Sequence, residues 1–322
     1  NTLQKNDNGT LVLAADNAAA GWAGTLFIQA GAVRVTNPLA LGASTVNSVT
    51  VNNSIGAALL MDGWSTDRNI TVNASGIESG GALQAVSGNN VLSGTLFLAN
   101  GPTVGADAGA SLTLSGSLTG GVTLNLAGAG SLFLSGTMGG TVPTGLTKLG
   151  SGVAQILAPY TNFTGGITIQ QGTLRFSGAN ARVGGSGGIT ITGSPFTSVL
   201  EIDDTGVAVA NRLGGRSITM NTGVIRYIAN GIAPSSEALG TLTMGNGPTE
   251  IQTLNSGGSA SSLTFSAISG QVGGSANLVL RSDNAFGPTS NQVFFSSGTA
   301  ATGGILRNVF VMESGTANFA TY

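Results

Sequence analysis

Cysteine and histidine are both absent from this chain of 322 residues. Without cysteine there is no disulfide framework, no thiolate nucleophile and no cysteine-based metal site. Without histidine, any general acid–base chemistry would fall to Asp, Glu, Lys, Arg or Tyr. We therefore expect neither a metal site nor a cofactor.

Charge is also scarce, at 7% of residues with 11 basic and 13 acidic side chains and a net charge of −2; roughly 25% is usual. No basic patch is available to neutralise phosphates, which argues against nucleic acid and anionic membrane surfaces as partners. No apolar run reaches the roughly 18 residues that a membrane-spanning helix needs, so no such segment is expected. Since Asn1 is neither an initiator Met nor the start of a signal peptide, we expect a mature chain after cleavage or a stretch of a longer protein.

The chain is instead rich in glycine, with 53 residues, and in short alternating segments. Hydrophobic residues make up 41% of it, which is too many for a disordered chain. Residues 10–13, 111–114 and 188–191 alternate apolar with small or polar side chains, the pattern of a half-buried strand. Turn sequences such as Asn8-Gly9 and Asn246-Gly247 separate such segments. No stretch has a helical period, so the sequence predicts an all-β protein of many short strands.

The chain also resembles itself at long range. Residues 26–35 (LFIQAGAVRV) align with residues 167–176 (ITIQQGTLRF), and other equivalent segments recur at a similar distance along the chain. We therefore predict two diverged tandem copies of a unit of about 145 residues, 1–147 and 148–322.

A long unit built only of short strands and turns favours a solenoid. Each strand would pair with its equivalent one coil above and below, and the inward Leu, Ile, Val and Phe would form a continuous core. Gly and Asn would occupy the corners, where a positive φ is needed. At about 20–25 residues per coil, the chain would make on the order of 14 coils.

One segment resembles a known family. Residues 148–174 contain Lys148, the Gly150-Ser151-Gly152 turn, a second turn at residues 160–166 (YTNFTGG) and Gly172-Thr173-Leu174. This succession is similar to the autotransporter-associated β-strand repeat, and residues 5–35 resemble it more loosely. The resemblance implies a right-handed parallel β-helix in very large secreted or surface proteins of bacteria, and it implies no activity.

The densest acidic cluster is Glu201, Asp203 and Asp204. One interpretation is a calcium site or the carboxylates of a glycosidase. The other is a row of outward strand positions, because apolar residues alternate with Glu201 and Asp203. We favour the second, and we expect Arg226, about one coil further along, to pair with Glu201 or Asp203 in a surface ladder.

Four residues form the candidate ligand-binding set. Asp62 and Asp67 flank Trp64, and an aromatic ring with polar neighbours suits a sugar. Trp22 is the aromatic residue of a second candidate pocket. The alternative for Trp64 is a turn whose indole covers the edge of the core.

Two lysines, Lys5 and Lys148, occupy equivalent positions of the two copies. An isopeptide crosslink is one interpretation, and a role fixed by the repeat is the other. We favour the repeat.

Parallel β-helices often act on polysaccharides, but the charges here are spread along the chain instead of concentrated on one face. We therefore do not expect an enzyme. The prediction is a structural β-solenoid, extracellular or on a bacterial cell surface, forming a segment or subunit of a fibre. Its partners would be copies of itself stacked end to end, and an extracellular polysaccharide or host surface. The alternative is a monomeric adhesin that binds glycan or a host surface; a polysaccharide lyase or hydrolase is the remaining option.

Overall fold

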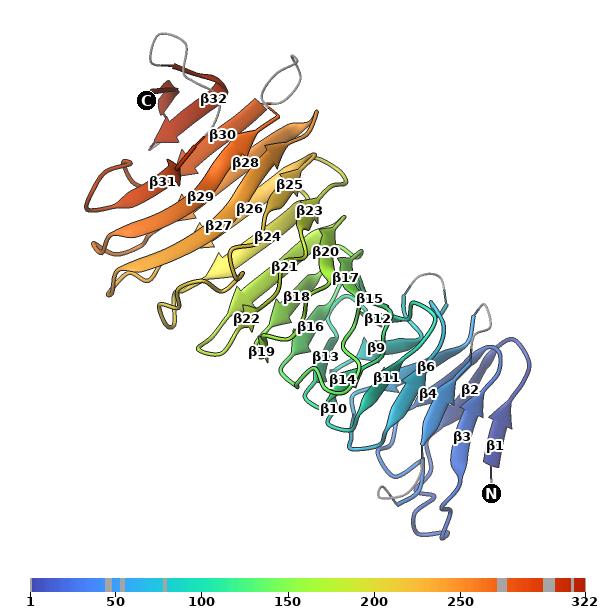
Figure 1. Ribbon diagram of the computed structural model, residues 1–322. Helices are drawn as coiled ribbons and strands as arrows, with labels where there is room; N and C mark the ends of the chain where they lie inside the picture. The colour runs from blue at the N-terminus through green and yellow to red at the C-terminus, as the bar shows by residue number, and fades with distance from the viewer. Residues whose placement is uncertain are drawn as a thin grey trace. The chain divides into compact units, whose positions relative to one another are not determined.

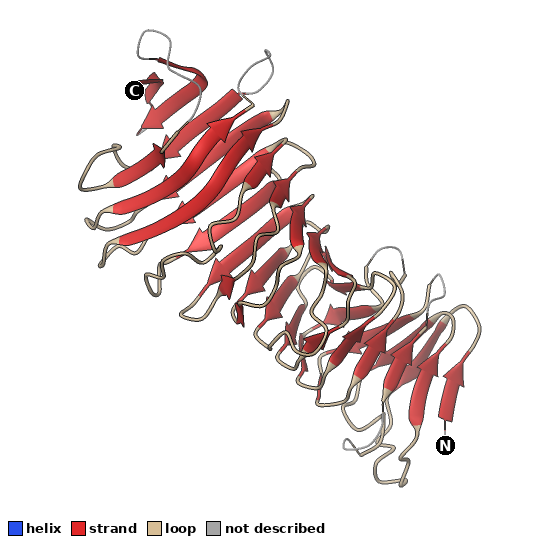
Figure 2. Cartoon of the chain, viewed as in Figure 1, coloured by secondary structure: helices blue, strands red, loops and turns tan. Residues whose placement is uncertain are grey.

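The computed structural model describes residues 2–43, 48–52, 56–77, 80–270, 277–297, 305–313 and 316–321. These residues form strands and turns and contain no helix (Figure 2). They therefore contain no helix that could cross a membrane. The strands stack in about 11 turns. Among the strand pairs whose register is described, all but β32 with β33 are parallel. The predicted all-β fold and parallel β-solenoid are confirmed. The chain divides into two compact units, Asn1–Ala158 and Pro159–Tyr322.

In the N-terminal unit, successive coils supply strands to three parallel sheets (Figure 1). The first sheet contains, in order, β1 (Thr2–Lys5), β3 (Thr25–Ile28), β5 (Val49–Val51), β8 (Ile70–Val72), β11 (Leu96–Leu98) and β14 (Leu118–Thr119). The second contains β2 (Thr10–Leu13), β4 (Ala32–Val35), β6 (Ala58–Asp62), β9 (Leu83–Ser87), β12 (Thr103–Ala106), β15 (Thr123–Gly128) and β17 (Gly145–Lys148). The third contains β7 (Ser65–Thr66), β10 (Asn89–Leu92), β13 (Ser111–Leu114), β16 (Ser131–Leu134) and β18 (Val153–Ile156).

The core of this unit consists of columns of apolar side chains. Val33 pairs in register with Leu59, Leu59 with Leu83, and Leu83 with Val104. All four are fully buried. Since side chains alternate between the two faces of a strand, the residue between two core positions points outward, as Arg34 does between Val33 and Val35. Alternate residues of each strand therefore belong to columns inside the core and to columns on the outer surface, which is how the period of two in the sequence appears in the structure.

The C-terminal unit has two long sheets and a short third one. The first contains β20 (Gly166–Ile169), β23 (Ile189–Ile191), β25 (Ile218–Met220), β27 (Ser235–Met244), β29 (Ser261–Ser269) and β31 (Asn291–Phe295). The second contains β21 (Gly172–Ser177), β24 (Ser198–Asp203), β26 (Gly223–Ile228), β28 (Pro248–Leu254), β30 (Asn277–Ser282), β32 (Ile305–Glu313) and β33 (Thr316–Thr321). The third is the pair β19 (Pro159–Tyr160) and β22 (Arg182–Val183). Strand β33 is antiparallel to β32.

Coil length differs between the units. In the N-terminal unit, a short coil joins the paired residues Leu114 and Leu134, and a longer one joins Ala32 and Ala58. The C-terminal unit spans a wider range, from the coil between Ile167 and Ile189 to the one between Leu278 and Val309. The predicted number of coils was therefore too high, because it assumed one short period throughout.

The two aligned segments have the same local structure. Residues 26–35 and 167–176 each contain parts of two strands and, at the aligned position, a glycine of positive φ. It is 66° at Gly31, just before β4, and 70° at Gly172, the first residue of β21. This agreement is local. The two-copy organisation, its boundary between residues 147 and 148 and the handedness of the winding stay predictions.

A column of glycines lies at one corner of the N-terminal unit. A Cβ atom on Gly94 would lie 2.1 Å from the carbonyl oxygen of Arg68, one on Gly116 would lie 1.9 Å from that of Gly94, and one on Gly136 would lie 1.7 Å from that of Gly116. None of the three glycines has a positive φ. The corner therefore requires glycine because successive coils approach too closely for a side chain, and not because of backbone handedness.

Substitution in this column is expected to destabilise the protein. In Gly116→Ala the new methyl group overlaps the backbone oxygen of Gly94 in the preceding coil, so the free energy of unfolding should fall by about 3 kcal/mol. The control is Gly258→Ala, where a Cβ atom meets nothing within 4 Å; its change should stay within about 0.5 kcal/mol. Chemical denaturation measures both, and equal stabilities would contradict the close approach.

Candidate functional site

The acidic cluster of the sequence lies at the end of β24. Glu201 is on the outward side of the strand, yet its side chain is only 2% exposed because two arginines cover it. Arg226 Nη1 lies 2.9 Å from Glu201 Oε2, and Arg175 Nε donates to Glu201 Oε1 from the other neighbouring strand. The predicted pairing of Arg226 with Glu201 is confirmed.

This ladder continues across the sheet. Arg175, Glu201, Arg226, Gln252 and Arg281 occupy one row of paired positions. Arg226 Nε donates to Gln252 Oε1 at 2.7 Å. Arg281 forms an ion pair with Glu250, two residues from Gln252 on β28. Exposed ion pairs contribute little one by one, so the row is best understood as a network that joins five coils.

The three acidic residues do not share a cavity. Asp203 is half-buried and accepts hydrogen bonds from the backbone N and Oγ of Thr205, at 3.0 and 2.7 Å. Asp204 is fully buried. Glu201 lies under arginines on the outer face. Within the described ranges, no group of three His, Cys, Asp or Glu side chains is placed to hold a metal ion.

The buried end of the cluster belongs to a polar network formed by the loop at residues 204–217. Arg212 is fully buried, and its Nε lies 2.7 Å from Asp204 Oδ1. Its Nη1 donates to the carbonyl oxygens of Gly178 and Ala181, at 2.6 and 3.2 Å. Its Nη2 donates to the carbonyl oxygen of Val207 at 3.2 Å. One guanidinium group therefore ties the loop to the preceding coil.

A second buried arginine, Arg216, binds only backbone oxygens among the partners described. Its Nη1 donates to the carbonyl oxygens of Gly165 and Gly187, both at 2.6 Å. Its Nη2 donates to that of Phe163 at 2.6 Å, and its Nε to that of Gly184 at 3.1 Å. The guanidinium carbon also lies 5.3 Å from the centre of the Phe163 ring. Burial lowers the pKa of Arg216, but these acceptors favour the charged form.

Glu237, on β27, completes the network. Its carboxylate oxygens accept hydrogen bonds from the backbone N of Arg212 at 2.8 Å and of Leu213 at 2.9 Å. Burial raises the pKa of Glu237 to about 7. Burial also raises the pKa of Asp204, against the opposing effect of Arg212. Tyr227 Oη donates to Asp204 Oδ2 at 3.2 Å.

No pattern in the sequence singled out Arg212, Arg216 or Glu237. The available signal was the long coil between the paired positions Ile189 and Ile218, which carries two arginines beside Gly214-Gly215. Without the register, the length of that coil was not known.

Trp64 and its flanking acids lie around the corner between β6 and β7. The indole is buried, and its Nε1 has no hydrogen-bond partner among the described residues. Asp62 forms an ion pair with Arg34 at 2.6 Å, and hydrogen bonds from Ser87 and Arg34 lower its pKa. Asp67 is exposed. The two acids therefore differ in setting, and the ring between them offers no face to solvent.

Trp22 is half-buried and lies elsewhere in the same unit. It lines a hollow of about 210 Å³ together with Leu3, Asn17 and Ala40. None of the other three candidate residues contributes to this hollow, so the structure does not bring the four into one site. Their role in ligand binding stays a prediction.

Lys5 and Lys148 each donate to the carbonyl oxygen two residues further along the chain. Lys5 Nζ donates to the carbonyl oxygen of Asp7 and, at 3.3 Å, to that of Ala30. Lys148 Nζ donates to the carbonyl oxygen of Gly150. Lys148 is fully buried, and burial lowers its pKa to about 8. Lys5 ends β1 of the first sheet and Lys148 ends β17 of the second. A role fixed by the repeat stays a prediction.

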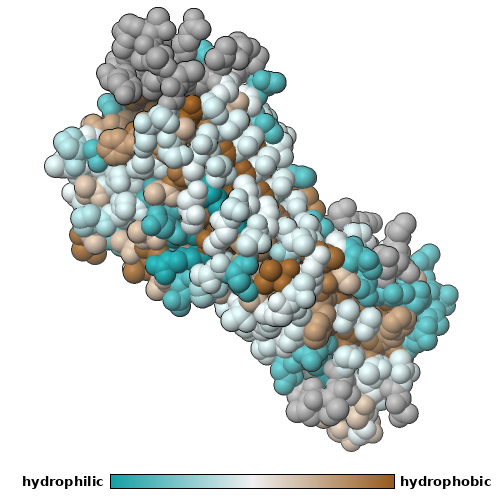
Figure 3. Space-filling view, in the orientation of Figure 1, coloured by the Kyte–Doolittle hydropathy of each residue, from teal (hydrophilic) through white to brown (hydrophobic). Residues whose placement is uncertain are grey.

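The surface seen in Figure 3 consists mostly of weakly polar residues, with strongly hydrophilic ones confined to small patches. Compared with protein-family models, curated proteins and solved structures, the chain matches none. The resemblance to the autotransporter-associated repeat therefore rests on the sequence pattern alone.

The raised pKa of Glu237 predicts how stability depends on pH. The unfolded chain ionises this group near pH 4.5, whereas the folded chain retains the proton to about pH 7. The free energy of unfolding should therefore fall by about 3 kcal/mol between these values as pH rises. Glu237→Gln, which does not ionise, should lack this part of the fall. Denaturant titrations at pH 5 and pH 8 measure how much the free energy of unfolding changes between these pH values. An equal change in the unaltered chain and in Glu237→Gln would contradict the prediction.

Proposed function

We propose that the chain is a structural β-solenoid of an extracellular or bacterial cell-surface protein. The observation that carries the proposal is the use made of its few charged side chains. Arg34 with Asp62, Arg226 with Glu201 and Arg281 with Glu250 each join residues 25 to 31 positions apart, one coil or slightly more. The chain has only 11 basic and 13 acidic side chains, and these three pairs each join one coil to another.

The physical consequence is a scaffold held together by contacts between neighbouring coils. In a solenoid, stability is approximately the sum of the coils and of the interfaces between them. Such a scaffold depends on no disulfide, since the chain has no cysteine. The resemblance to a repeat of bacterial surface proteins supports the proposed location.

End-to-end stacking is the assembly we propose for it. Strands β1 and β2 each pair on one side only among the described residues. The inward residues Leu3, Leu11 and Leu13 of this coil are half-buried, whereas their paired positions in the next coil are fully buried. Another copy of the chain placed here would cover this apolar surface and extend two ladders. In the C-terminal unit, β33 interrupts the parallel order of its sheet, so the sheet whose last strand is β31 would make the contact.

Electron microscopy of the purified chain, with sedimentation velocity over a range of concentrations, tests this assembly. We expect unbranched fibres whose length increases with concentration. Leu11→Asp places a charge in the stacking surface and should abolish them. The matched control, Thr168→Asp on the outer face of β20, should assemble normally.

Short isolated particles at every concentration would refute stacking and leave a scaffold that works as a monomer or as a segment. Labelling of intact source cells with an antibody against the chain tests the location separately. A signal only after permeabilisation would contradict a surface role.

A further inference from the structure

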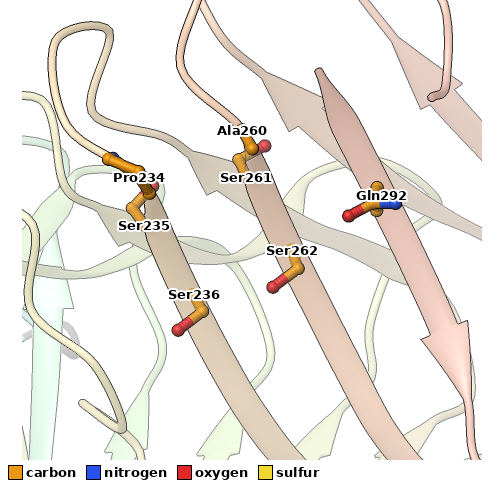
Figure 4. Close-up of a pocket in the computed structure, with 7 residues that line it drawn as sticks. All are labelled: Pro234, Ser235, Ser236, Ala260, Ser261, Ser262 and Gln292. Atoms are coloured by element: carbon orange, nitrogen blue, oxygen red, sulfur yellow. The ribbon is translucent and has the colours of Figure 1, made fainter. Parts of the chain in front are cut away.

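A shallow hollow of about 170 Å³ lies where three strands of the C-terminal unit begin, β27, β29 and β31 (Figure 4). It is lined by Pro234, Ser235, Ser236, Ala260, Ser261, Ser262 and Gln292. All of these side chains are uncharged. None of them belongs to a motif of the sequence.

The register of the strands builds this hollow. Ser235, Ser261 and Asn291 form one row of paired residues, and all three are buried. The following residues, Ser236, Ser262 and Gln292, form the next row and therefore point outward. In Figure 4 the hydroxyl groups of Ser236 and Ser262 project in the same direction, with Gln292 on the next strand.

The outer row is free to bind a ligand. Within the described part of the chain, the side chains of Ser236, Ser262 and Gln292 make no hydrogen bond to protein, whereas Ser261 Oγ and Asn291 Oδ1 of the inner row are 2.7 Å apart. The outer row thus offers two hydroxyl groups and one amide, each of which both donates and accepts.

An exposed aromatic ring lies beside this row. Phe295 points inward and stacks on Phe265, with ring centres 5.4 Å apart. Phe294 therefore points outward, on the same face as Gln292, and it is 46% exposed. Two residues along a strand separate these side chains by roughly 7 Å, and neighbouring strands are roughly 5 Å apart. A single sugar ring on Phe294 is within reach of Gln292 and Ser262.

We propose that this face, from Ser236 to Phe294, binds a neutral polysaccharide. The apolar C–H face of one hexose packs on the Phe294 ring, and its hydroxyl groups exchange hydrogen bonds with Gln292 and Ser262. The next sugar of the chain reaches Ser236, one strand further across the sheet. An aromatic platform with a few placed polar groups is the usual composition of a small-molecule site. With no charged side chain in the lining, the site has no means of attracting an acidic glycan. This binding is independent of the proposed scaffold role.

Isothermal titration of the whole chain with soluble neutral oligosaccharides, namely α- and β-linked gluco-oligosaccharides and manno-oligosaccharides, tests the proposal. Oligogalacturonate serves as the acidic comparison. We expect binding to at least one neutral series, weakened at least tenfold by Phe294→Ala and by Gln292→Ala. The matched control is Phe97→Ala on β11, which removes a phenylalanine of similar exposure, 43%, and should bind as the unaltered chain does.

Circular dichroism and denaturant titration establish that each variant is folded. Binding of oligogalacturonate alone, no binding of any neutral oligosaccharide, or an affinity unchanged in both variants would each overturn the proposal. An equal loss in Phe97→Ala would also overturn it, because the effect would then not belong to this face. Fibre formation is unaffected by these outcomes, so the scaffold proposal is judged separately.

Discussion

Each coil of this protein depends on backbone hydrogen bonds to the coils on either side of it. Buried backbone groups must be paired, and here strands one coil apart provide most of the partners. The same register stacks identical faces, so columns such as Val33, Leu59 and Leu83 form the core. Where the third side of the C-terminal unit has no ladder, guanidinium groups take its place. Arg216 binds four carbonyl oxygens there, and Arg212 binds three.

Because charged side chains join one coil to the next, their closeness in the sequence does not indicate a ligand-binding site. Glu201 and Asp204 are three positions apart, but one lies under arginines on the outer face and the other lies in the interior. Buried ion pairs are costly to desolvate, and their best-supported effect is to fix one arrangement. In this chain, that arrangement is the docking of residues 204–217. The row that we propose for a ligand, which contains Ser262 and Gln292, is uncharged.

The sequence was informative wherever structure follows from a short local pattern. Alternation over short segments predicted the strands, and a spacing of about one coil predicted the pair of Glu201 with Arg226. The long loops were not predictable, because coils of the C-terminal unit differ widely in length. Ser236, Ser262 and Gln292 meet only because two coils of unequal length follow one another, so no fixed period places them together. The corner glycines show a further limit of the sequence. A glycine can be required by the close approach of two coils or by a positive φ, and the sequence does not distinguish the two reasons.

Amide hydrogen exchange in the C-terminal unit tests most directly whether side chains close the third side. The amides of Arg212 and Leu213 lie outside any strand and donate only to Glu237 among the bonds described. We expect them to exchange as slowly as the paired amides of β24 and β26, because the whole network must open to expose them. Rapid exchange at both positions, at the rate of the exposed residues around Gly206, would contradict the claim that buried side chains replace the missing ladder.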